Sequence, residues 1–312
     1  MAGKLLAQIA LGLGLAASST SIFAEDTKAG AGARRALIVC GLTGDATHRA
    51  LFSQTIESIF TGLTTHHGFS TENVAVLWSE PKENNDGPAL LASAGAATRE
   101  ALAESAIKIV ESLQPRDALW VFVLGHAHFD GKNSWLNLPG PDINQVEFAA
   151  LFSAAACQEQ VFFMTTSASG FFIKPLSKAG RIIVSATEAD REVNETIFPH
   201  KLAAALDQPP PYLEFDMDGD GRVSLFDVYL WAAQATAQEY ATEMLLATEH
   251  ANLDDNGDGR GTELQRSFLT EELGGRRAPD RPPPLIVSGD GALARGLQLY
   301  YPPSPPAPHG RD

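Results

Sequence analysis

The sequence predicts a three-layer α/β protein, in which a mostly parallel sheet lies between helices and a helical extension follows at the carboxyl end. Two observations carry this prediction. Short, continuous apolar runs alternate with segments of helical periodicity, which is the pattern of parallel strands buried on both faces. After residue 207 the pattern changes to two aspartate-rich loops that flank residues 224–250, a segment without Pro or Gly. That segment is expected to form one long helix.

The elements of the α/β domain follow in chain order over residues 35–206. Strands are expected at the apolar runs 35–41, 73–78, 118–125, 160–166 and 180–187. Helices are expected between and after them, at about 47–65, 98–113, 144–155 and 194–206. Strands that alternate with helices in this way predict a parallel sheet with helices on both faces.

Both ends of the chain carry segments that are expected to lie outside the fold. Lys4, the apolar run 5–17 and small polar residues up to Ala24 are typical of an export signal. Residues 1–24 are therefore expected to be removed near Ala24, which would leave a periplasmic or secreted protein; an uncleaved anchor is the alternative. No later segment has the roughly 18 to 20 continuous apolar residues of a membrane helix, so no stable membrane insertion is expected. The Pro- and Gly-rich tail 274–312 is expected to be partly disordered.

Charge and cysteine content narrow the classes of function. The formal net charge of −15 argues against nucleic acid as a partner and favours cations. The two cysteines, Cys40 and Cys157, end one strand and precede another, so they are expected near opposite sheet edges, beyond disulfide reach. Both are expected to be free, buried thiols. His48, His66 and His67 are expected at the surface.

The first aspartate-rich loop, DMDGDGRVSLFD, fits a twelve-residue calcium loop. Alternate side chains point inward in such a loop, a glycine at the sixth position permits the sharp turn, and a carboxylate at the twelfth closes the coordination sphere. Asp at the twelfth position reaches less far than the usual Glu, which predicts weaker calcium binding. The alternative is a set of Asx turns that cap a helix. The expected Ca²⁺ ligands are Asp216, Asp218, Asp220, the carbonyl of Arg222, Ser224 and Asp227.

The second loop, DDNGDGRGTELQ, offers Asp254, Asn256 and Asp258 as calcium ligands but ends in Gln265, so the closing carboxylate is missing. Glu263 is a candidate substitute. The alternative is a solvated turn that ends the long helix. Residues 207–273 are thus interpreted as two EF-hand-like loops at the two ends of one helix.

Three segments that leave the carboxyl ends of predicted strands carry chemically active side chains. They are CGLTGD after the first strand, GHAHFDG with His126 after the third, and TTSASG with Ser167 after the fourth. In parallel α/β sheets the ligand site lies beyond the carboxyl ends of the strands. The three segments are therefore expected to converge.

The sequence Gly-His126 after one strand and Ser167-x-Ser-Gly after the next resembles the caspase and legumain (hemoglobinase) cysteine peptidases, nearer to legumain-like bacterial proteins than to true caspases. In that family a His and a Cys at the ends of neighbouring strands form the catalytic dyad, and the Cys stands in an Asp-Ala-Cys-x-Ser-Gly context. The resemblance covers residues 35–206 and implies the caspase-hemoglobinase fold. This chain departs from the family pattern at Ser167, Thr165 and Ala127.

The replacement of Cys by Ser at position 167 leaves three interpretations open. A serine hydroxyl needs a base and normally a third group that orients the base, for which Asp45, Asp130 and Asp142 are candidates. The first interpretation is a peptidase homologue without activity that binds a peptide or protein in the old cleft. The second is a serine hydrolase that uses Ser167 with His126 as base, and the third is an accidental likeness. A calcium-dependent binding or scaffolding module is a further alternative.

Overall fold

The computed structural model describes residues 32–79, 89–190, 192–270, 276–277, 286 and 288–299. The predicted export signal 1–24, the last dozen residues and most of the rest of the tail 274–312 lie outside the described residues. The described residues belong to one unit that begins at Gly32. Among them, no helix is long and apolar enough to cross a membrane.

A seven-stranded, mostly parallel sheet forms the centre of the fold, in the order β10-β9-β8-β4-β1-β2-β3. Its strands pair in parallel except for β10, which runs antiparallel to β9. The predicted α/β class with a mostly parallel sheet is therefore confirmed. The strands are β1 (Arg34–Cys40), β2 (Val74–Trp78), β3 (Gly95–Ala96), β4 (Ala118–Leu124), β8 (Glu159–Met164), β9 (Arg181–Ser185) and β10 (Asn252–Asp254).

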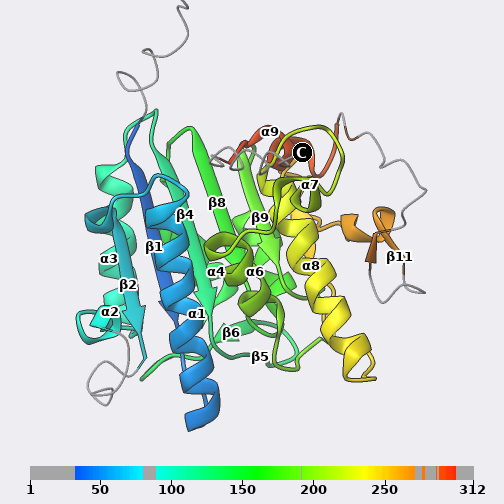
Figure 1. Ribbon diagram of the computed structural model, residues 1–312. Coiled ribbons are helices and arrows are strands. Elements are labelled where there is room, and N and C mark those ends of the chain that lie inside the picture. Colours follow the sequence, from blue (N-terminus) through cyan, green and yellow to red (C-terminus); the bar gives the residue numbers. More distant parts are fainter. Residues whose placement is uncertain are drawn as a thin grey trace, which may run out of the picture. The chain divides into compact units, whose positions relative to one another are not determined.

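Helices cover both faces of this sheet, and alternation along the strands divides the core into two clusters. In β4, Trp120, Phe122 and Leu124 belong to one cluster, whereas Leu119, Val121 and Val123 belong to the other. Successive strand residues point to opposite faces, so each apolar run supplies both clusters. The first face is covered by α1 (Ala46–Thr65), α6 (Phe198–Asp207) and α8 (Leu225–Thr242), seen side by side in Figure 1. The second is covered by α3 (Arg99–Ser112) and α4 (Gln145–Leu151).

Polar residues at the helix starts explain where these helices begin. The Asp45 side chain accepts hydrogen bonds from two amides of the first turn of α1, and Thr98 caps α3. Asn144 and Ser224 begin α4 and α8 with capping boxes. Each cap satisfies amides that have no partner inside the helix.

Short elements complete the fold. A three-stranded antiparallel sheet follows β4 and consists of β5 (Ala127–Phe129), β6 (Ser134–Leu136) and β7 (Ile143–Asn144). The β11–β12 pair joins Leu269–Thr270 to Arg276–Arg277. The remaining short helices are η1 (Thr71–Asn73), α2 (Ala89–Ala92), η2 (Ser169–Phe172), α5 (Ile173–Leu176), α7 (Tyr212–Phe215), η3 (Leu264–Ser267) and α9 (Ala292–Gly296).

Several expectations for the carboxyl-terminal half are wrong. The helix expected over 224–250 ends at Thr242, because Met244 adopts a left-handed backbone conformation, φ 54°, that reverses the chain. The second aspartate loop therefore does not end a helix; it follows β10, and Leu253 bridges Thr262 across it. Residues 207–270 also do not form a separate appendage, because β10 extends the main sheet and α8 contributes to its core.

The cysteine and histidine expectations are corrected in part. Cys40 and Cys157 are not in a disulfide, but only Cys40 is fully buried. His67 is not at the surface: its ring is buried beside Trp120, and Nε2 lies 3.2 Å from the carbonyl oxygen of Leu206.

Candidate functional site at the carboxyl ends of β1, β4 and β8

The three segments that leave the carboxyl ends of β1, β4 and β8 meet at one edge of the sheet. The His126 ring, after β4, lies against the Thr43 carbonyl, after β1. The Ser167 hydroxyl, after β8, contacts the backbone of Ala127. Neighbouring parallel strands place these loops together, as expected for this topology.

His126 is held by a backbone carbonyl rather than by a carboxylate. Its Nε2 lies 3.1 Å from the Thr43 oxygen, and the rings of Phe52 and His48 stand edge-on to it, each with its centroid 6.1 Å away. Because a carbonyl oxygen only accepts, the proton of a neutral imidazole is assigned to Nε2, which leaves Nδ1 as the basic nitrogen.

The Ser167 hydroxyl forms a pair of hydrogen bonds with one residue. Its Oγ donates to the Ala127 carbonyl oxygen over 2.7 Å and accepts from the Ala127 amide over 3.3 Å. The residue is 3 % exposed. In the part of the chain that the structure describes, no hydrogen bond joins this hydroxyl to the His126 ring. The proton that a general base would remove is thus directed at a carbonyl group.

The residues after Ser167 anchor the loop to the end of β9. Ala168 has a left-handed backbone, φ 50°, which is rare for a residue with a β-carbon. The Ser169 hydroxyl accepts hydrogen bonds from the amides of Ala186 and Thr187, and the Gly170 amide donates to the Thr187 hydroxyl. The Ser169 hydroxyl and the Gly170 amide therefore form hydrogen bonds inside the protein and are not available to bind an oxyanion.

Gly170 is required by close packing. A β-carbon at this position would lie 2.3 Å from the carbonyl carbon of Glu188, which is closer than two carbon atoms can approach. The glycine therefore lets the Ser167 loop pass directly against the segment after β9.

The three acidic residues expected as orienters of His126 have other partners. Asp45 caps α1 and contacts His48; Asp130 accepts from the Trp135 indole, and Asp142 accepts from the Leu138 amide. Among the described residues, none of the three hydrogen-bonds to His126. His128 lies in strand β5, is exposed and pairs with Asn137.

Sequence reasoning missed His48 as a neighbour of the site. Its Nδ1 lies 2.8 Å from Asp45, its Nε2 lies 2.8 Å from Glu195, and its ring faces His126. The spacing Asp45-x-x-His48 in a first helical turn is the local signal for the first contact. No local pattern signals Glu195, which arrives from the loop after β9.

Cys157 does not lie at this edge of the sheet, and Cys40, which ends β1 at this edge, is fully buried. Cys157 precedes β8, whereas Ser167 follows it. The Cys157 thiol donates to the Glu159 carbonyl, and burial raises its pKa to about 11.

The first aspartate loop gathers three carboxylates. Ligand oxygens of Asp216, Asp218 and Asp227 lie within 4.8 Å of one another. The turn that brings them together passes through Gly219 and Gly221, both with positive φ. The Asp216 carboxylate accepts from the amides of Asp220 and Gly221, each over 3.0 Å.

The donor set and electrostatics of this cluster fit a hard cation. Asp227 accepts hydrogen bonds from the amides of Met217, Asp218 and Ser224, yet burial raises its pKa to about 6. Burial also raises the pKa of Asp218, against the opposing effect of the nearby Arg295. A divalent cation would offset this charge, and oxygen ligands are those that Ca²⁺ takes.

A guanidinium group lies beside the same carboxylates. Arg295 Nε, from α9, is 2.7 Å from Asp218 Oδ2 and 3.2 Å from Asp220 Oδ2. Residues 297–299 then run antiparallel to the end of the loop, with the Leu225 amide donating to Leu297. Sequence reasoning missed these partners, because they come from the tail.

The second aspartate loop turns its side chains onto its own backbone. Asp254 accepts from the amides of Gly257 and Gly259, Asn256 from that of Asp258, and Asp258 from that of Arg260. Gln265, at the closing position, bonds instead to Tyr229 and to the Ala251 carbonyl. In the described ranges, Asp216, Asp218 and Asp227 form the only group of three metal-ligand side chains that lie close enough together to hold an ion.

No protein-family model matches the chain, and no curated protein matches it significantly.

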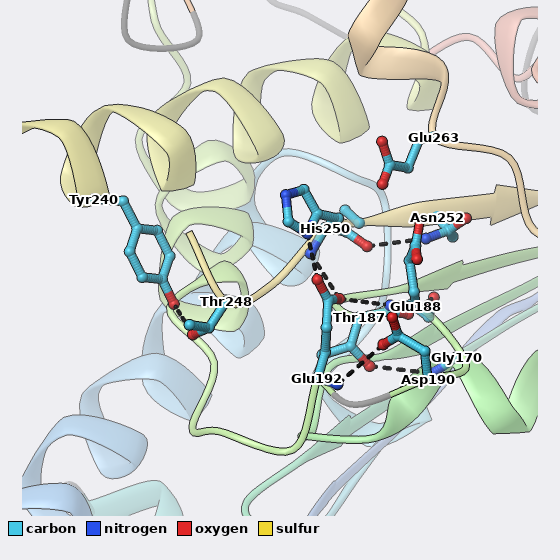
Figure 2. Close-up of polar contacts among 12 residues, drawn as sticks. Gly170, Thr187, Glu188, Asp190, Glu192, Tyr240, Thr248, His250, Asn252 and Glu263 are labelled. Atoms are coloured by element: carbon cyan, nitrogen blue, oxygen red, sulfur yellow. Dashed lines mark hydrogen bonds and ion pairs between the residues drawn. The ribbon is translucent and has the colours of Figure 1, made fainter. Parts of the chain in front are cut away.

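Glu192 connects the Ser167 loop to the carboxyl-terminal half. Figure 2 shows its contacts with Glu188 and His250. Its carboxylate accepts from the amides of Glu188 and His250 and pairs with the His250 ring, while its carbonyl accepts from the Ala168 amide. Burial alone would raise its pKa, but these hydrogen bonds hold the pKa of Glu192 below its usual value. The bond to Glu192 raises the pKa of His250.

Proposed function

We propose that this protein is an exported, calcium-binding homologue of the legumain- and caspase-type peptidases that lacks cysteine-peptidase activity and binds a peptide or protein at the old cleft. The observation that carries the proposal is the state of the Ser167 hydroxyl. It is buried and pairs with both backbone groups of Ala127. A hydroxyl in this state serves the fold, because attack on a substrate would first require two hydrogen bonds to break.

The positions of the thiols support the absence of cysteine chemistry. A nucleophilic thiol needs a lowered pKa and access to substrate. Cys157 lies before β8, and burial raises its pKa to about 11. Cys40 ends β1 and is fully buried.

Calcium binding at the first loop is supported by the cluster of three carboxylates. Asp216, Asp218 and Asp227 would supply side-chain oxygens, Asp220 a further carboxylate and Arg222 its carbonyl. The cation would neutralise charge at the start of α8, whose Phe226 and Tyr229 belong to the core. Its contribution is therefore to stability of the fold.

Calcium-dependent melting tests this part of the proposal. We expect calcium to raise the melting temperature of the full-length protein relative to the same protein in EDTA. Asp216→Asn should abolish the rise, whereas Asp258→Asn, the same type of change at an exposed position of the second loop, should preserve it. A rise that survives Asp216→Asn, or no rise at all, would contradict calcium binding at the first loop.

A serine hydrolase is the second candidate, and one observation favours it. The Thr43 carbonyl fixes the proton of His126 on Nε2, so Nδ1 is available as a base. Ala168, in its strained conformation beside Ser167, is a feature often found at catalytic turns.

Labelling with a fluorophosphonate probe separates the two candidates. The proposed non-catalytic protein should remain unlabelled, both as the native chain and as Ser153→Ala, an exposed serine control. Labelling that disappears in Ser167→Ala and in His126→Gln would overturn the proposal in favour of the hydrolase.

A further inference from the structure

A pocket of about 920 Å³ opens beside helix α8, and neither Ser167 nor His126 lines it. It lies between α8, the segment 245–251 that follows the chain reversal, and the residues around η3. Small-molecule sites typically have volumes of about 300–1,000 Å³ and apolar walls with a few polar groups. The size of this pocket therefore suits a small organic ligand.

The walls of the pocket are mostly apolar. Ala233, Ala237 and Ala241 recur at every fourth position of α8 and so lie along one face of the helix. Their small side chains leave a trough along α8. The opposite walls are formed by Phe198, Leu245, Leu246 and Leu269. Such a trough fits a flexible aliphatic chain.

Two buried polar groups in the walls lack hydrogen-bond partners. Thr236 is 5 % exposed, and its Oγ1 has no partner among the described residues. The Glu263 side chain is 9 % exposed, and its Oε1 accepts no hydrogen bond. In Figure 2 the Glu263 carboxylate is turned toward His250. Buried polar groups are normally paired, so both point to a ligand that supplies donors.

The charges around the pocket favour a cationic ligand. Glu263 forms an ion pair through Oε2 with Arg266, whose side chain is 67 % exposed, and this leaves Oε1 without a partner. Glu249 lies in the same walls, its carboxylate facing the amides of Ile197 and Phe198. His250 also lines the pocket, but its Nδ1 is paired with Glu192. Arg266 also lines the pocket, but its charge is paired with Glu263, so an incoming carboxylate would still meet the carboxylate of Glu249. An ammonium group would instead bring three donors.

We propose that this pocket binds a small amphiphile with an aliphatic body and a protonated amine. The aliphatic body lies along the alanine face of α8. The amine donates to Glu263 Oε1 and to the Thr236 hydroxyl.

The proposal is tested by calorimetric titration of the full-length protein with decylamine and decanoate, each below its micelle-forming concentration, and with decan-1-ol below its solubility limit. Decylamine should bind about tenfold more tightly than decanoate or decan-1-ol. Glu263→Gln should weaken decylamine binding about tenfold and leave decan-1-ol binding unchanged. Glu243→Gln, an exposed carboxylate outside the pocket, is the matched control and should change neither.

A variant that fills the pocket tests whether the ligand binds along α8. Ala237→Leu should weaken the binding of decylamine and decan-1-ol alike, and Ala241→Leu serves the same purpose if the first variant melts at a lower temperature than the native chain. The proposal is overturned if decylamine does not bind, if decanoate binds as tightly, or if folded pocket-filling variants bind as the native chain does.

Discussion

The hydroxyl of Ser167 donates to the carbonyl oxygen of Ala127 over 2.7 Å and accepts from the amide of the same residue over 3.3 Å. This pair of bonds joins the loop after β8 to the first residue of β5. Both partners are buried. The serine therefore holds the loop that leaves the main sheet against the first strand of the small sheet.

Removal of this hydroxyl is expected to destabilise the protein. Ser167→Ala should lower the free energy of unfolding by about 1–3 kcal/mol, because it leaves two buried backbone groups without a partner. Urea denaturation measures the change. Ser153 is a suitable control, since its hydroxyl also donates to a carbonyl but is exposed; Ser153→Ala should change the free energy by less than about 0.5 kcal/mol. Equal effects of the two substitutions would show that the Ala127 contacts contribute little.

The sequence predicted the central strands well because each is a continuous apolar run. The expected strands 118–125 and 160–166 correspond to β4 and β8 within two residues at each end. The small sheet β5–β7 and strand β10 were missed. These strands have two or three residues each, and their pairing depends on partners distant in sequence, which no local pattern records.

The limits of prediction at the candidate site have the same cause. The topology rule placed the His126 and Ser167 loops together, because neighbouring parallel strands end at one edge. It did not predict that Ser167 bonds to Ala127 instead of the His126 ring, since this depends on β5. Likewise, the acidic pattern identified Asp218, but its partner Arg295 comes from the tail.

The contact between Arg295 and Asp218 predicts competition with calcium. In the absence of the metal, the guanidinium offsets the charge of Asp218 and Asp220. Arg295→Gln should therefore lower the melting temperature in EDTA. It should also enlarge the rise in melting temperature produced by calcium, because calcium then no longer has to displace the guanidinium group. Thermal melts with and without calcium measure both effects. Arg260→Gln, an exposed arginine in the second loop, should leave both unchanged; an identical response of the two variants would contradict competition at the first loop.

The buried ring of His67 predicts a loss of stability in mild acid. Burial lowers its pKa to about 4, against an ordinary value of 6.5. Between these two pKa values the unfolded chain binds a proton at His67 and the folded protein does not. The neutral ring therefore contributes to stability above about pH 6.5, and this contribution is lost as the pH falls toward 4. Through this ring the native chain should lose on the order of 2 kcal/mol of its free energy of unfolding between pH 7 and pH 5, and His67→Gln should abolish that loss.

Urea denaturation across this pH range measures the His67 contribution. The comparison uses the difference in slope between the native chain and the variant, because other groups titrate in both. His128→Gln, an exposed histidine, should keep the native slope. If His67→Gln also keeps it, the ring does not resist protonation in the folded state.

The left-handed conformation of Met244 predicts a stabilising substitution. Met244, φ 54°, ends α8, and the Leu245 amide then donates to the Tyr240 carbonyl over 2.9 Å. Glycine adopts this conformation without the cost of about 1–2 kcal/mol that a β-carbon imposes, and the Met244 side chain, 92 % exposed, contributes little packing. Because glycine also loses more backbone entropy on folding, Met244→Gly should raise the free energy of unfolding by about 0.5–1 kcal/mol.

Urea denaturation measures this change in the free energy of unfolding. Glu243→Gly is the control, because Glu243 has an ordinary helical backbone and glycine there should destabilise the protein. Destabilisation by both substitutions would mean that the left-handed turn carries no strain.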